Sequence, residues 1–186
     1  ALTALLFACG GDSGKTGEDG NNKPDEMPKE ELLVDNTLEK DSLKIYPMGV
    51  SPEYPDAKLT LKSPAADGKV AAGEIGFEFD VMSETYKLGN QTSDAETKNC
   101  ANSGKGQHIH LILNNEPYSA HYESSFKREL ADGHYVALSF ISRSYHESIK
   151  TSDAYQLFQF TVGNAEAKKA DLAAAHVVYS RPKGEY

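Results

Sequence analysis

The chain has 186 residues, with 28 acidic and 19 basic side chains and a formal net charge of −9 at pH 7. Binding to nucleic-acid phosphates depends on clustered lysine and arginine, so this balance argues against a nucleic-acid partner. The chain has no tryptophan but ten tyrosines and seven phenylalanines, and with its many short alternating runs this composition predicts an all-β domain.

Residues 1–9 have the features of the end of a truncated lipoprotein signal peptide. Leu6, Phe7, Ala8 and Cys9 form a lipobox behind an apolar run, in which a small residue precedes the cysteine that becomes acylated. We therefore expect Cys9 to carry lipid and to anchor the protein to a membrane of the bacterial cell envelope. Gly10 stands where Asp would favour inner-membrane retention, which favours the outer membrane. An envelope protein could be the partner of a protein anchored there.

Residues 10–40 are predicted to be an acidic, disordered tether. They contain nine acidic and four basic residues and few apolar ones, so they cannot bury enough surface to offset the entropy lost on ordering. The remaining chain divides into one β domain over 41–163 and a short segment over 164–186.

Within 41–163 the first predicted strands are residues 58–61 and 73–81. In the second, Ile75, Phe77 and Phe79 alternate with polar residues, the period-2 pattern of a strand with one solvated face. A polar loop over 82–105 follows, unusually long for a compact domain. It contains Cys100, which we interpret as a buried apolar residue, a metal ligand or half of an intermolecular disulfide.

Residues 107–113 form the next predicted strand, with Ile109 and Leu111 on one face and His108 and His110 on the other. Residues 118–122 and 126–130 are shorter predicted strands. The stretch Leu130-Ala131-Asp132-Gly133-His134-Tyr135 then resembles the L-x-D-G-x-Y pattern of immunoglobulin-like sandwiches, in which the tyrosine bonds to upstream backbone. This resemblance implies an immunoglobulin-like antiparallel β-sandwich, with final strands from 133 through 140 and at 155–162.

Residues 164–186 complete the chain. Residues 165–175 are rich in alanine and predict a short helix or a linker. Residues 177–184 repeat the order of an apolar strand, a proline and a glycine that is also present at 59–68. We interpret them as the possible start of a truncated second domain.

The order of strand, long loop, Gly106-Gln107-His108-Ile109-His110 and L-x-D-G-x-Y resembles a group of small bacterial lipoproteins and periplasmic proteins with an Ig-like domain of unknown function. The resemblance covers about residues 58–163. Some of these relatives carry the label "phosphopeptide-binding", but the matching region has no dense arginine cluster to support that role here.

In a sandwich of this type the loops 82–105 and 142–152 share one end. That end would bring together seven residues with useful chemistry: Cys100, His108, His110, Arg143, Tyr145, His146 and Glu147. Imidazoles two apart on a strand project from the same face, and neutral imidazole with thiolate suits copper or zinc. His108, His110, Cys100 and His146 are therefore candidate metal ligands, and Arg143, Tyr145 and Glu147 are candidate ligand-binding residues.

The alternative to a metal site is that His108 and His110 are ordinary polar residues on a solvated strand face. A blue-copper site is not expected, because all three methionines precede Cys100. The chain has no H-E-x-x-H or G-x-S-x-G motif and no glycine-rich phosphate loop. We therefore expect a non-catalytic, lipid-anchored binding or structural module of the cell envelope, with a copper- or zinc-binding lipoprotein as the alternative.

Overall fold

The computed structural model describes residues 38–41, 43–45, 49–98 and 100–180. These ranges contain ten strands and no helix, so none of them includes a helix long and apolar enough to cross a bilayer. Cys9 and most of the predicted tether lie outside them. The last three tether residues form strand β1 (Leu38–Lys40), which pairs with β2 (Leu43–Ile45) in a unit that ends at Gly49.

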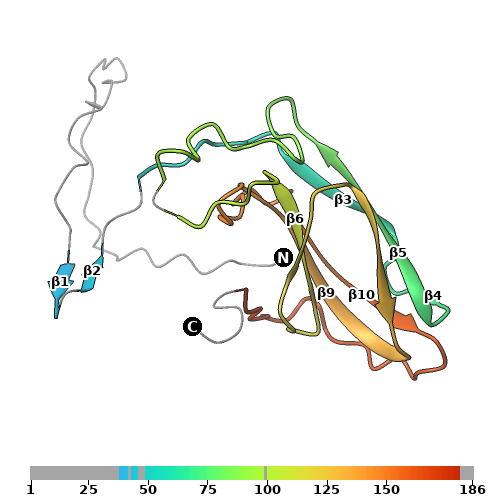
Figure 1. Ribbon diagram of the computed structural model, residues 1–186. Helices are drawn as coiled ribbons and strands as arrows, with labels where there is room; N and C mark the ends of the chain where they lie inside the picture. Colours follow the sequence, from blue (N-terminus) through green and yellow to red (C-terminus); the bar gives the residue numbers. More distant parts are fainter. Residues whose placement is uncertain (1–37, 42, 46–48, 99, 181–186) are drawn as a thin grey trace, which may run out of the picture. The chain divides into compact units, whose positions relative to one another are not determined.

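The unit that begins at Val50 is a β-sandwich of two sheets. Its three-stranded sheet has the order β3 (Lys58–Ser63), β5 (Gly73–Met82), β8 (Ser125–Leu130). The five-stranded sheet has the order β4 (Lys69–Val70), β10 (Tyr155–Val162), β9 (Gly133–Ser142), β6 (His108–Leu113), β7 (Ser119–His121). Figure 1 shows β3 and β5 along one side of the sandwich and β6, β9 and β10 along the other.

The strand order is that of an immunoglobulin-like sandwich, which confirms the predicted fold class. From β5 onward the chain changes sheet between β5 and β6, between β7 and β8 and between β8 and β9, whereas β9 and β10 form an antiparallel hairpin. The expected tyrosine bond is also present, because the Tyr135 hydroxyl donates to the Ala131 carbonyl over 3.0 Å. Strand β4 pairs with β10 in parallel, while the other pairs are antiparallel.

Alternating apolar residues of both sheets form the core. Phe77 and Phe79 of β5 pack edge to face against Phe160 and Phe158 of β10, with ring centroids 5.8 and 6.5 Å apart. Aromatic pairs in this arrangement add to the stabilisation from burial alone. Strand β6 departs from the alternating pattern, because all six of its residues are buried. The solvated face that one interpretation gave to His108 and His110 is therefore covered.

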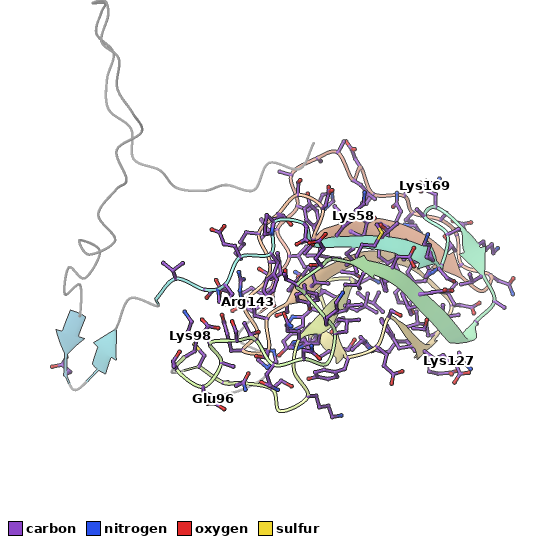
Figure 2. All side chains as sticks on the ribbon, turned by 90° about the horizontal axis from the view of Figure 1, so that it is seen from above. Lys58, Glu96, Lys98, Lys127, Arg143 and Lys169 are labelled. Atoms are coloured by element: carbon purple, nitrogen blue, oxygen red, sulfur yellow. The ribbon has the colours of Figure 1, made fainter. Side chains whose placement is uncertain are left out.

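The two long loops meet at one end of the sandwich, as predicted. The Ser103 amide donates to the Ser144 carbonyl over 2.8 Å, and the Ser144 amide donates to the Thr92 hydroxyl over 2.9 Å. In Figure 2, Lys98 and Arg143 lie toward this end and Lys127 lies toward the other. These bonds join the loop between β9 and β10 to the long loop that precedes β6.

The segment after β10 narrows one prediction and corrects another. Residues 165–175 contain no helix, which leaves the linker interpretation, and residues 177–180 contain no strand. Side chains, and not a helix or a β-ladder, provide hydrogen-bond partners for the backbone of this segment. Gln159 bonds both the amide and the carbonyl of Ala170, and Asn115 accepts from the Tyr179 amide over 2.7 Å. Residues 181–186, the rest of the proposed second domain, lie outside the described residues.

His121 of β7 is expected to make the domain less stable in acid. Its ring stacks on Phe126 of the other sheet, with centroids 3.3 Å apart. Burial, followed by the charge of Arg128, lowers the pKa of His121 from 6.5 to about 4. The unfolded chain therefore binds more protons than the folded one between these pH values, so stability is full above pH 6.5 and falls as pH falls toward 4.

Urea unfolding of wild type and His121→Phe at pH 7 and pH 4.5 measures this effect. The phenylalanine keeps an aromatic ring beside Phe126 but does not titrate. We expect the variant to lose less unfolding free energy between the two pH values than wild type does. Equal losses would show that the pKa of His121 is the same in the folded and unfolded states.

Candidate metal centre

His108 and His110 point away from the core from the same face of β6. This strand lies between β9 and β7 in its sheet, and Ile109 and Leu111 fill the core on its other face. Both histidine side chains are completely buried. Two buried imidazoles side by side need polar partners, because an unsatisfied buried polar group costs free energy.

His146 reaches the same place from the loop between β9 and β10. Its φ of 67° is in the left-handed region, where histidine is one of the few enriched residues apart from glycine. The turn is closed by the His146 amide, which donates to the Arg143 carbonyl over 3.0 Å, and by the Arg143 amide, which donates to the Glu147 carbonyl over 2.8 Å. The backbone of this turn therefore presents the half-buried His146 ring to the two histidines of β6.

Three ring nitrogens form a small triangle. His108 Nε2 lies 2.8 Å from His110 Nε2 and 3.2 Å from His146 Nδ1, and the third side, from His146 Nδ1 to His110 Nε2, is 3.4 Å. The circle through them has a radius of about 1.8 Å, and zinc binds imidazole nitrogen at about 2.0–2.1 Å. One ion can therefore contact all three atoms.

Hydrogen bonding alone does not account for this triangle. A hydrogen bond joins one N–H to one lone pair, and among three nitrogens at least two must be of the same kind. At most two of the three contacts can therefore be hydrogen bonds. A metal cation resolves this conflict, because it accepts lone pairs from all three nitrogens.

The other nitrogen of His108 fixes its tautomer. His108 Nδ1 lies 2.8 Å from the carbonyl oxygen of Gly106, which can only accept. Nδ1 therefore carries the proton, and Nε2 of the neutral ring presents its lone pair to the triangle. A backbone carbonyl that orients a histidine in this way is common around bound metals.

Aromatic rings surround the three histidines. Tyr118 stacks on His110 with centroids 4.0 Å apart and an interplanar angle of 10°. The ring centroid of Phe140 lies 4.9 Å from that of His110, and the ring centroid of Tyr122 lies 5.1 Å from that of His108.

Tyr86 holds the end of β6 to β9, because its buried hydroxyl lies 3.3 Å from the carbonyl oxygen of His108 and 2.9 Å from that of Ser142. Burial raises the pKa of Tyr86 well above its usual range.

Sequence reasoning did not assign Phe140, Tyr86 or Gly106 a role at this site. Phe140 follows from the strand register, since it pairs with His110. Tyr86 lies in the long loop, where no periodic pattern points to a partner.

The structure places the other candidate residues outside the triangle. Cys100 is exposed, and the group of possible metal ligands among the described residues is His108, His110 and His146. The Arg143 guanidinium is buried and donates to the carbonyls of Pro52 and Ser148.

Tyr145 and Glu147 are also held by neighbours in the fold. The Tyr145 hydroxyl lies 3.4 Å from the Asp94 carboxylate, and burial raises the pKa of Tyr145 to about 12. Glu147 accepts from the Ser51 hydroxyl and lies 3.7 Å from the Arg143 guanidinium. Arg143 and Glu147 line a hollow of about 320 Å³, and binding of a ligand there stays a prediction.

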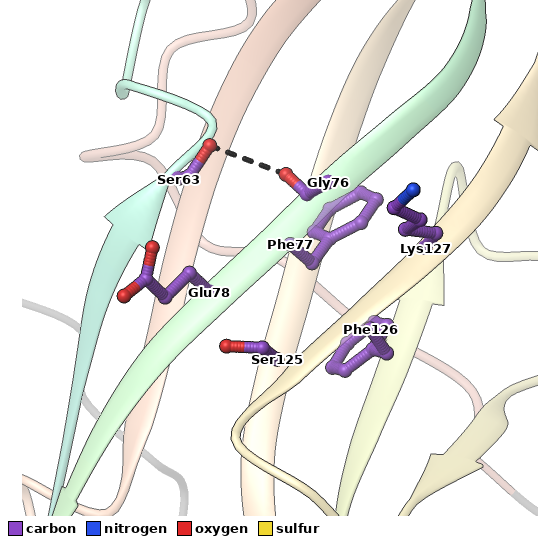
Figure 3. A pocket seen from close by; sticks show the side chains of 7 residues that line it. All are labelled: Ser63, Gly76, Phe77, Glu78, Ser125, Phe126 and Lys127. Atoms are coloured by element: carbon purple, nitrogen blue, oxygen red, sulfur yellow. Dashed lines mark hydrogen bonds between the residues drawn. The ribbon is translucent and has the colours of Figure 1, made fainter.

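A second hollow has no metal-binding chemistry. It is an open groove of about 410 Å³ over β5 and β8, and Figure 3 shows the side chains around it. Gly76 leaves part of this space, because a Cβ there would meet nothing within 4 Å. The Ser63 hydroxyl donates to the Gly76 carbonyl over 3.2 Å. No histidine or cysteine lines the groove. The candidate metal site is therefore identified by its three histidine nitrogens and not by a hollow in the surface.

No protein-family model matches the chain, and no curated protein matches it either. Among solved structures, the chain is similar to the CARDB domain of the PF1109 protein from Pyrococcus furiosus, a crystal structure in complex with di-metal ions. The two share 10% sequence identity with a TM-score of 0.32, over 61% of this chain and 98% of that one. At this level of similarity, no residue role is carried over to this chain.

Proposed function

We propose that this chain is a metal-binding β-sandwich protein that holds one copper or zinc ion through His108, His110 and His146. The observation that carries the proposal is the triangle of ring nitrogens with sides of 2.8, 3.2 and 3.4 Å. Neutral imidazole suits both metals. The burial of His108 and His110 also supports a metal site, because burying two polar rings costs free energy unless their nitrogens have partners.

We also propose that the site belongs to a lipid-anchored envelope protein with a binding role. The support for the anchor is the lipobox that ends at Cys9. With lipid on Cys9, the metal site would stay at a membrane surface, and residues after Cys9 would link it to the anchor. The mass of the N-terminal peptide of the mature protein tests this part, because acyl chains add a defined mass to Cys9 and an unmodified cysteine would refute the anchor.

Metal titration of the full chain tests the metal site. We expect metal-free protein to take up one zinc ion per chain, measured by calorimetry and by elemental analysis after desalting. His146→Ala should weaken binding by at least about 100-fold, because loss of even an outer partner of a ligand costs 10- to 100-fold. His146 is the ligand of choice for this variant, since it is only half buried and lies in a loop.

His176→Ala is the matched control. This histidine lies outside the triangle, and its Nε2 contacts the Asp171 carbonyl over 2.9 Å. We expect the control to bind zinc as wild type does. If wild type retained no zinc or copper above background, or if both variants bound equally well, the proposed site would be wrong.

A further inference from the structure

The three imidazoles can fill only one side of a bound ion. With nitrogens on a circle of about 1.8 Å radius, an ion at 2.0–2.1 Å lies about 1 Å out of their plane. This is the pyramidal arrangement of three ligands of a tetrahedron. Structural zinc sites take four protein ligands, whereas sites with three protein ligands keep the fourth position for an external molecule.

The three ligands also leave the charge of the ion uncompensated. Neutral imidazoles carry no charge, and no carboxylate or thiolate of the described residues joins the group. Nearby acids have cationic neighbours: Glu147 lies 3.7 Å from Arg143, and Asp94 lies 3.4 Å from Lys98. A divalent ion would keep its full charge among aromatic rings, where a charge without a counter-charge is costly.

The surroundings restrict the size of a fourth ligand. His108 and His110 are fully buried, while His146 is partly exposed and marks the side nearest to solvent. Tyr118 and Tyr122 stand with ring centroids 4.0 and 5.1 Å from the histidine rings they contact. We therefore expect a ligand that enters beside these rings to be small.

We propose that the fourth position of the metal is exchangeable and takes a small monovalent anion. This inference rests on the proposed function, since it needs the ion to be present. The anion completes the tetrahedron and reduces the net charge of the buried site from +2 to +1. The site would therefore bind small inorganic anions of the azide or hydroxide type through the metal.

Cobalt(II) and azide are the probes that test the proposal. Cobalt(II) replaces zinc and gives visible absorption bands that change with its ligands. We expect the full chain to bind one cobalt(II), and added azide to change these bands to a saturating 1:1 end point. Bands that stay unchanged at high azide, with cobalt still bound, would overturn the exchangeable position and leave the metal site intact. Absence of cobalt bands would overturn both.

A charge variant separates anion binding at the metal from a general salt effect. Tyr122→Glu places a negative charge beside His108 and should weaken azide binding by at least tenfold, either by repulsion or by occupying the fourth position. His176→Glu makes a similar change of charge at a histidine outside the site and should leave azide affinity within twofold of wild type. Equal azide affinity in wild type and Tyr122→Glu would count against the proposal.

Discussion

Replacing Gly106 with alanine is expected to destabilise the domain by at least about 3 kcal/mol and to abolish tight metal binding. Gly106 has a φ of 86°, in the left-handed region that alanine rarely adopts. Its added Cβ would lie 2.4 Å from the Gly89 carbonyl oxygen and 2.6 Å from that of Asn90. These are backbone atoms, so they cannot rotate away as a side chain would.

The same glycine positions one of the proposed metal ligands. Its carbonyl accepts from His108 Nδ1, and the next residue, Gln107, pairs through its backbone with Gly89 and Asn90. A shift of this backbone would move the His108 ring, although no ligand is substituted. We therefore expect Gly106→Ala to lower both the zinc affinity and the stability of the domain. A substitution at a position that serves packing alone would lower stability only.

Gly104→Ala is the matched control for this prediction. Gly104 lies two residues earlier in the same loop, has no positive φ, and its added Cβ would meet nothing within 4 Å. Urea unfolding and zinc calorimetry of the two variants should show a near-native Gly104→Ala and an impaired Gly106→Ala. If both variants matched wild type, the close approach at Gly106 would not constrain the site.

Much of the sandwich could be predicted because its signals are local. The alternation of Ile75, Phe77 and Phe79 with polar residues predicts β5, and all three are buried. The L-x-D-G-x-Y pattern places Tyr135 at the start of β9, where its hydroxyl makes the expected backbone bond. Patterns of period two and turn motifs depend on near neighbours in sequence, so a single sequence shows them.

The candidate site could be predicted only in part, because its details depend on long loops. The shared loop end brings His146 to His108 and His110 as expected, but Cys100 is exposed. No repeating pattern specifies where a residue in a loop of more than twenty residues lies. Side-chain and backbone bonds such as those between Thr92 and Ser144 decide it, and such contacts over 52 residues leave no signal in sequence.

The burial of His108 and His110 also could not be predicted from a local sequence pattern. Alternation shows that His108 and His110 share a face, but it cannot show what covers that face. The cover comes from Tyr118 and Tyr122 after the strand and from His146, which is 36 residues beyond His110. A solvated strand face and a buried site have the same spacing, and the difference arises from tertiary packing.

Loading the metal-free protein with zinc is expected to raise its melting temperature by about 10 °C. An ion that binds the folded state stabilises it by about 2.7 kcal/mol at a concentration 100-fold above its Kd, and each kcal/mol shifts the melting temperature of a domain of this size by a few degrees. The unfolded chain cannot match this binding, because His110 and His146 are separated by 36 residues and converge only when β6 and the loop after β9 are in place.

Calorimetric scans at several zinc concentrations measure this linkage. The melting temperature should rise with the logarithm of free zinc, and a chelator should return it to the metal-free value. His146→Ala should show a much smaller rise, whereas His176→Ala should behave as wild type. A wild-type melting temperature that is independent of zinc would mean that the triangle of nitrogens is held by the fold without a metal. The contact among His108, His110 and His146 that cannot be a hydrogen bond would then have to be relieved by rearrangement of the rings.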